Sequence, residues 1–182
     1  MEKNAIKIKL SVIGDECTGK SIFLKYLNNN KLDKSEYVEY IPTSGAAYFL
    51  KRLIYKNKIY SFEFWDNAGN IKYRSLNMIF VSNSKVILIF YNHMNRNSFE
   101  TAKELISRSK DRCINNPIYV LVCNKYQLNM NEKTKNIVRD EEVLEYAEKN
   151  DILFSHISIF DKYEDGINEL LIKILDKYIK NK

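Results

Sequence analysis

The hydrophobic and polar positions of this chain change their period several times, from short apolar runs to longer stretches with the spacing of an amphipathic helix. The short apolar runs predict strands over 5–14, 85–92, 118–124 and 152–158. Two further segments, 46–55 and 58–65, predict an antiparallel hairpin with Asn57 in its turn. The helical spacing predicts helices over 20–27, 98–113, 139–150 and 167–180.

This alternation of strands and helices predicts an α/β fold in three layers, with helices on both faces of a sheet. The runs at 85–92 and 118–124 are almost continuously apolar, which is typical of parallel strands buried on both faces. We therefore expect a six-stranded, mostly parallel sheet with one antiparallel hairpin strand, and about five helices. These elements leave no room for a second domain, so residues 1–182 are expected to form a single domain.

Residues at the helix ends predict where the helices begin. Ser98 is the expected N-cap of the helix over 98–113. The helix over 139–150 is acidic in its first turn and basic at its end, an arrangement that suits the helix dipole. Gly166 is expected to precede the last helix.

The stretch "GDECTGKS" has the phosphate-loop pattern, in which two glycines separated by four residues are followed by Lys and Ser. It lies between a predicted strand and a predicted helix, as the pattern requires. Backbone N–H groups of such a loop surround a polyphosphate, Lys20 would reach the β- and γ-phosphates, and the Ser21 hydroxyl would ligate Mg²⁺. The candidate phosphate-binding residues are Gly14, Asp15, Glu16, Cys17, Thr18, Gly19, Lys20 and Ser21.

Three shorter patterns follow in an order that fits the same chemistry. In "WDNAG", Asp66 is placed to hold Mg²⁺ through water, and the Gly69 N–H is placed to contact a γ-phosphate. In "PTSG", Thr43 offers a second hydroxyl to the metal. In "CNKYQ", Asn124 and Lys125 follow a core strand, where they would brace the loop and flank a base.

Taken in order, "GDECTGKS", "PTSG", "WDNAG", "NKYQ" and "HISIF" resemble the guanine-nucleotide motifs of the Ras-superfamily small GTPases. The resemblance extends from about residue 6 to 178. Within the superfamily, Trp65, "KYRSL" and "NSFE" make the sequence most similar to Rab proteins. It implies the P-loop fold, bound GTP or GDP with Mg²⁺, and a role in vesicle trafficking. It also implies effector and regulatory proteins that bind through about 40–50 and 66–80, and nucleotide contacts from Ser158 and Ile159.

Several residues depart from the family's pattern. Gln127 replaces the Asp that reads guanine, so base recognition is expected to be weaker or altered, since charge-assisted hydrogen bonds are about twice as strong as neutral ones. Asn70, one methylene shorter than the usual Gln, is the candidate for positioning water, and Lys20 is the other catalytic candidate. Glu16 stands where the family has a small residue, so its carboxylate would repel phosphate unless it turns to solvent or pairs with a Lys. Slow GTP hydrolysis is the expected result.

Other interpretations of the same residues stay open. The chain could be a pseudo-GTPase, an interaction module with weak or altered nucleotide binding. A nucleoside or nucleotide kinase would share the phosphate loop, but it leaves "NKYQ" unexplained. The aromatic or apolar residue that stacks on the base is one of Leu32, Tyr37 and Tyr40.

Composition bounds the class of protein without changing this picture. The 182 residues are 45% hydrophobic with a formal net charge of +6, and basic and acidic residues are interleaved, so we do not expect nucleic-acid binding. A monomer is expected. Three scattered cysteines predict neither a disulfide framework nor a zinc site, which favours the cytoplasm. No run approaches the ~20 apolar residues of a membrane span. Attachment to the cytosolic face of an endomembrane would need a lipidated tail outside this chain.

Overall fold

The computed structural model describes residues 5–29, 46–70, 72, 79–124, 137–157 and 164–182. Its elements in chain order are β1 (Ile6–Gly14), α1 (Lys20–Asn29), β2 (Ala46–Tyr55), β3 (Lys58–Asn67), β4 (Val86–Asn92), α3 (Arg96–Arg112), β5 (Ile118–Asn124), α4 (Asp140–Lys149), β6 (Leu153–Ile157) and α5 (Glu164–Lys180). A short helical segment also covers 79–81. Each strand and helix predicted from the periodicity is present, with ends shifted by a few residues at most.

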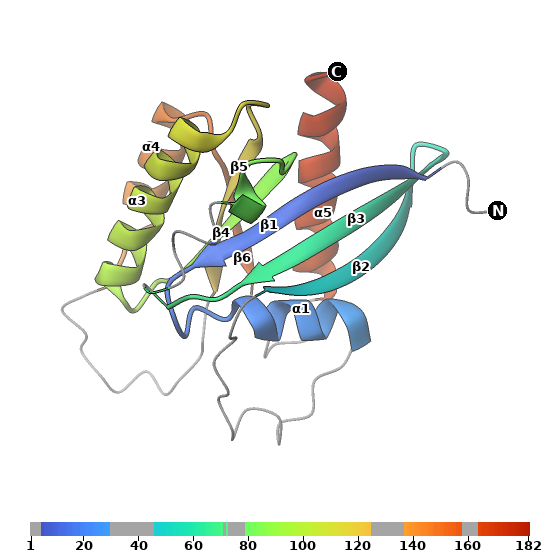
Figure 1. Ribbon diagram of the computed structural model, residues 1–182. Coiled ribbons are helices and arrows are strands. Elements are labelled where there is room, and N and C mark those ends of the chain that lie inside the picture. Colours follow the sequence, from blue (N-terminus) through green and yellow to red (C-terminus); the bar gives the residue numbers. More distant parts are fainter. Residues whose placement is uncertain (1–4, 30–45, 71, 73–78, 125–136, 158–163) are drawn as a thin grey trace.

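The strands form one six-stranded sheet in the order β2-β3-β1-β4-β5-β6 (Figure 1). Only β2 and β3 pair antiparallel, and every other neighbouring pair is parallel, so the predicted fold class is confirmed. The central strand β1 pairs Val12 with Asp66 of β3 and Gly14 with Phe90 of β4. This register brings the end of β1, where the phosphate loop begins, beside the start of the "DNAG" motif.

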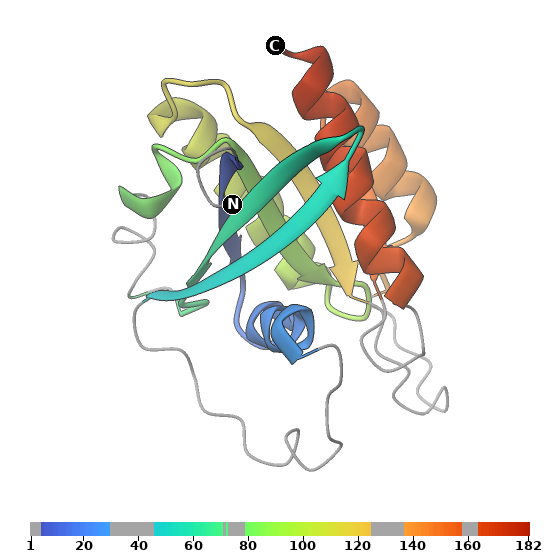
Figure 2. The ribbon, with the colours of Figure 1, turned by 90° about the vertical axis from the view of Figure 1, so that its right-hand side faces the viewer.

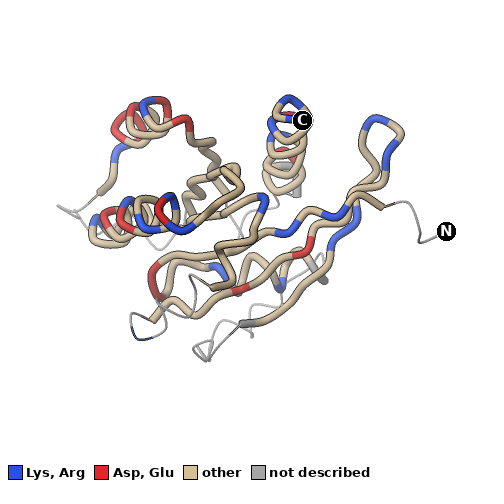
Figure 3. Tube along the Cα trace, turned by 45° about the horizontal axis from the view of Figure 1, so that its top comes forward, with Lys and Arg blue, Asp and Glu red and all other residues tan. Residues whose placement is uncertain are grey.

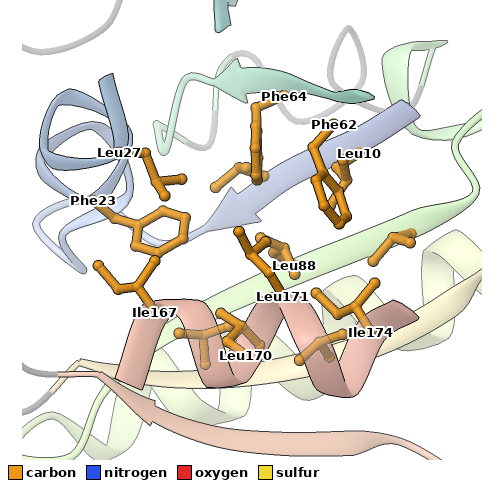
Figure 4. Packing of buried hydrophobic residues seen from close by; sticks show 14 of the residues in the cluster. Leu10, Phe23, Leu27, Phe62, Phe64, Leu88, Ile167, Leu170, Leu171 and Ile174 are labelled. Carbon is orange, nitrogen blue, oxygen red and sulfur yellow. The ribbon is translucent and has the colours of Figure 1, made fainter. Parts of the chain in front are cut away.

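Helices cover both faces of the sheet, as the figures show from two directions (Figures 1 and 2). On one face, Phe23 and Leu27 of α1 and Leu171 of α5 pack against Leu10 and Phe64 of the sheet (Figure 4). On the other face, α3 and α4 bury a second cluster, to which Phe99, Ala102, Val143 and Ala147 contribute. The nearly continuous apolar sequence of β4 and β5 follows from this arrangement, because both of their faces are covered.

The β2–β3 hairpin turns at the two residues predicted from the sequence. Lys56 and Asn57 both have positive φ, of 49° and 60°, as a two-residue type I′ turn requires. The closing pair is Tyr55 with Lys58. The strand β3 continues to Asn67, two residues beyond the predicted end, so it carries Asp66 into the sheet.

Two predicted helix starts were wrong. The N-cap of α3 is Asn95, whose side chain accepts a hydrogen bond from the Ser98 N–H, and the helix begins at Arg96. The Ser98 hydroxyl instead donates to the Asn95 carbonyl at 2.7 Å and is buried. Gly166 does not precede α5, which begins at Glu164. A Cβ at Gly166 would meet the His156 carbonyl oxygen at 3.8 Å, an ordinary contact distance. The backbone at residue 166 therefore does not require glycine, and the helix can begin before it.

Charges of both signs share the surface helices (Figure 3). On α3, Lys103 pairs with Glu100 at 2.8 Å, and Arg96 makes two 2.7 Å hydrogen bonds with Glu142 of α4. Among the described residues, none of the helices is both long and apolar enough to cross a bilayer.

Candidate nucleotide-binding site

The phosphate loop is fixed at both ends by the elements that it joins. Gly14 has φ +146°, and a Cβ there would collide with the Phe90 carbonyl of the neighbouring strand, so the position requires glycine. At the other end the Phe23 N–H donates to the Gly19 carbonyl at 2.9 Å and begins α1. Because Phe23 is fully buried against the sheet, the start of α1 is held in place under the loop.

Lys20 points into this loop and is only 6% exposed. Its Nζ donates to the Asp15 carbonyl at 2.6 Å and lies 3.5 Å from the Thr18 hydroxyl. Burial lowers the pKa of Lys20, and the carboxylate of Asp66 opposes that shift. A buried ammonium group held by a backbone carbonyl is suited to exchange that carbonyl for an anionic ligand such as phosphate.

Gly69 lies directly against this lysine. A Cβ at Gly69 would be 2.7 Å from the Lys20 Nζ and 2.9 Å from the Asp15 carbonyl carbon. The peptide of the "DNAG" motif therefore contacts the phosphate loop so closely that no side chain fits. This contact brings the motif's backbone to the place where the sequence predicts the end of a polyphosphate.

Ser21 and Asp66 form a pair of oxygen ligands next to the loop. The Ser21 hydroxyl donates to Asp66 Oδ2 at 2.6 Å, and Asp66 is 1% exposed. Hydroxyl and carboxylate oxygens are the ligands that Mg²⁺ takes in phosphate sites, directly or through water. These two residues fit a magnesium ion held jointly with phosphate oxygens. Thr43, the other predicted ligand, lies outside the described residues.

On the side predicted for the base, Asn124 contacts the phosphate loop. It ends β5, is completely buried, and donates from Nδ2 to the Thr18 carbonyl at 3.2 Å. One loop is thereby held by residues more than a hundred positions apart in the sequence. The other base-side predictions, Lys125, Gln127, Ser158 and Ile159, lie outside the described residues.

The outer side of the loop carries the residues that depart from the usual pattern. Asn70 Nδ2 donates to Glu16 Oε1 at 2.7 Å, while Asn70 Oδ1 accepts the Lys72 N–H at 2.9 Å. Glu16 itself is exposed. The sequence left two outcomes open for Glu16, exposure to solvent or pairing with a Lys, and the structure shows it exposed. Its hydrogen bond with the Asn70 amide was not predicted.

Cys17 and Asn67 complete the surroundings of the loop. Cys17 is exposed and has φ 57°, a left-handed conformation that glycine adopts more easily than any other residue. Asn67 is buried and donates from Nδ2 to the Val12 carbonyl at 3.2 Å and to the Trp65 carbonyl at 3.0 Å. Sequence reasoning missed this link between β1 and β3, although an amide inside "WDNAG" was a visible signal.

Comparisons with known proteins agree with this geometry. The model of the Ras family matches residues 9–180. The chain is 28% identical over 175 residues to "Ras-related protein Rab-5A" of Dictyostelium discoideum, covering 96% of this chain and 82% of that protein. It is 31% identical over 179 residues to "Probable Rab-related GTPase" of Acanthamoeba polyphaga mimivirus, covering 97% of this chain and 78% of that protein.

The chain therefore belongs to the Ras family of small GTPases. Its sheet order, its phosphate loop and its Rab-named relatives confirm the resemblance inferred from the motifs. A guanine-nucleotide-binding protein with a P-loop is the class that fold and sequence define together.

Proposed function

We propose that this protein is a Rab-like molecular switch that binds GTP and GDP with Mg²⁺, hydrolyses GTP slowly and acts in vesicle trafficking. The observation that carries the proposal is the convergence of Lys20, Ser21, Asp66 and Gly69 on one loop. An ammonium group, a hydroxyl, a carboxylate and a closely packed backbone supply the contacts that a polyphosphate and its metal need.

Each of these residues has a distinct task in the proposed switch. Lys20 would exchange its Asp15 carbonyl contact for β- and γ-phosphate oxygens. Ser21, released from Asp66, would ligate the ion, whose charge would neutralise phosphate oxygens when bound. The Gly69 N–H would detect a γ-phosphate, and Thr43 would join the metal in the triphosphate state. Loss of the γ-phosphate would then release the segments around 40–50 and 66–80.

Slow hydrolysis is proposed because Asn70 is shorter than the usual Gln. A misplacement of about one ångström in such a group can cost on the order of a hundredfold in rate. The contact with Glu16 adds support, since it engages the amide group that would have to hold the water.

Partner binding through the two switch segments has a structural basis in an aromatic cluster made of Tyr48, Trp65 and Phe80. The Trp65 ring stacks on Phe80 with centroids 5.7 Å apart and makes a T-shaped contact with Tyr48, with centroids 5.3 Å apart. Tyr48 is 50% exposed. Effector and regulatory proteins would therefore find apolar surface beside both segments. We propose that the protein is a cytoplasmic monomer that acts at the cytosolic face of an endomembrane.

The nucleotide content of the purified protein tests the proposal. The protein is denatured, and the released nucleotide is identified by chromatography and compared with the protein concentration. Stoichiometric GDP or GTP is expected. A folded protein that releases no nucleotide would contradict the switch and leave a pseudo-GTPase module in its place.

A further inference from the structure

The carboxamide of Asn70 has both of its polar atoms engaged inside the protein. Its Nδ2 donates to Glu16 Oε1 at 2.7 Å, and its Oδ1 accepts the Lys72 N–H at 2.9 Å. We propose that Glu16 is a positioning residue that locks Asn70 in an orientation unable to hold the attacking water. This inference rests on the proposed function, because it concerns GTP hydrolysis at the same site.

Water positioning needs an orientation of the Asn70 side chain that differs from the one these two hydrogen bonds hold. A carboxamide that orients an attacking water uses its oxygen as the acceptor for a water hydrogen. In this structure Asn70 Oδ1 accepts a backbone N–H instead, and the amide nitrogen is directed at Glu16. The side chain must break at least one of these hydrogen bonds before it can turn toward a phosphate.

The backbone next to Asn70 cannot compensate by moving closer. Gly69 already lies against Lys20 and Asp15, with a contact too close for a Cβ. The adjustable part is therefore the Asn70 side chain, and Glu16 is the residue from the phosphate loop that holds it. The lock thus joins two positions at which this chain departs from the family's pattern.

The lock and simple charge repulsion predict different outcomes for the same site. Repulsion would come from the negative charge of Glu16 near the γ-phosphate. The lock comes from an acceptor oxygen at the end of the side chain, and Glu16→Gln retains such an oxygen without the charge. Glu16→Ala removes both the charge and the acceptor.

Single-turnover hydrolysis of bound GTP separates the two. Glu16→Ala is expected to hydrolyse GTP about fivefold faster than the wild type, which corresponds to about 1 kcal/mol in the barrier. Glu16→Gln, whose neutral acceptor makes a hydrogen bond about half as strong, is expected to gain only about twofold. Adding Asn70→Ala to Glu16→Ala should abolish the gain. Glu141→Ala, which removes another exposed carboxylate, from α4, is the matched control and should leave the hydrolysis rate unchanged.

Three results would overturn the lock. One is an equal gain in Glu16→Gln and Glu16→Ala, which would assign the slow rate to charge. The second is a gain in the double variant as large as in Glu16→Ala, which would exclude Asn70. The third is a wild-type rate in Glu16→Ala.

A second measurement does not depend on bound GTP. Hydrogen exchange of the Lys72 amide in nucleotide-free protein should be faster in Glu16→Ala and in Asn70→Ala, less so in Glu16→Gln, and unchanged in Glu141→Ala. If the protein binds no guanine nucleotide, the proposed function fails, and this comparison still decides the lock. Unchanged exchange in Glu16→Ala would refute it.

Discussion

The phosphate loop has two sides that are built differently. Its floor, made of Thr18, Lys20 and Asp66, is between 1% and 6% exposed. Its outer wall, made of Glu16, Cys17 and Asn70, is exposed or half-buried. Lys20 in the floor has the residue type of the phosphate-loop pattern, whereas Glu16 and Asn70 in the wall depart from the family's pattern.

The difference indicates which task each side is suited for. Binding needs polar groups that are already in place. Lys20 in the floor is held by a 2.6 Å hydrogen bond to the Asp15 carbonyl, and Asp66 by one of 2.6 Å from the neighbouring Ser21 hydroxyl. Cleavage needs a side chain that can hold the attacking water, but Asn70 in the wall is hydrogen-bonded to Glu16 and to the Lys72 N–H. The protein is therefore expected to bind nucleotide well and to hydrolyse it slowly. The following experiments test each side of this contrast.

The largest effect is expected from Lys20→Ala, which removes the buried charge of the floor. Affinity for GDP should fall about 100-fold, because a charged hydrogen bond contributes up to about 3 kcal/mol. The nucleotide-free variant should unfold no earlier than the wild type, since burial lowers the pKa of Lys20 and makes its charge costly. Titration with labelled GDP and thermal unfolding measure the two effects.

Lys25→Ala is the matched control, because Lys25 lies on the same helix and is exposed. It should bind GDP as the wild type does. Wild-type affinity in Lys20→Ala would contradict the account of the floor.

The next effect concerns the metal. Chelation of Mg²⁺ should speed GDP release from the wild type at least about tenfold, since the ion would join protein and phosphate oxygens. In Ser21→Ala, release should already be fast and should respond little to chelation. Stopped-flow release of labelled GDP gives both rates, and Ser107→Ala, an exposed serine of α3, is the control. Equal responses to chelation in wild type and Ser21→Ala would remove Ser21 from the metal site.

Gln127→Asp tests whether GDP affinity depends more on the floor of the phosphate loop than on contacts with the guanine base. Restoring a carboxylate should raise GDP affinity about tenfold, because charge-assisted hydrogen bonds are roughly twice as strong as neutral ones. Affinity for ADP should not rise. Competition between GDP and ADP measures the preference, and a parallel gain for both nucleotides would show that residue 127 does not read the base.

The smallest effect is expected in the wall, at Cys17. Its φ of 57° costs a residue with a Cβ about 1–2 kcal/mol, and more for a β-branched one. Cys17→Val should therefore lower the free energy of unfolding by about 1 kcal/mol. Cys17→Gly should change it by less, because the relief of strain is offset by the greater entropy of an unfolded glycine. Denaturant titration of both variants checks the order, and a more stable Cys17→Val would contradict it.

Much of the fold could be predicted from local sequence. Continuous apolar runs predicted β4 and β5, and Lys56 and Asn57 predicted the place of the hairpin turn, whose type is known only from their φ values. The first residues of the helices were less predictable, since several residues near the N-terminus of a helix can act as its N-cap. Asn95 and Ser98 are both good N-caps, and the choice of Asn95 leaves the Ser98 hydroxyl to bond the backbone of the preceding turn.

In the candidate site, too, some features could be predicted from local sequence and others could not. The sequence alone predicted that Gly14 to Ser21 form a loop between a strand and a helix, because that depends on the order of residues within one segment. The motifs also predicted that Ser21 and Asp66 serve one magnesium ion. They did not predict that these two side chains bond directly across 45 residues, or that Glu16 meets Asn70 across 54.

Those contacts depend on the register of β1 with β3, which pairs Val12 with Asp66 and brings Gly69 against Lys20. The sequence by itself determined which chemical groups the protein has for binding a nucleotide. Only the tertiary structure decided which groups are free to act and which hold one another, because side chains from separate segments meet only after the sheet has formed and the helices have packed on it.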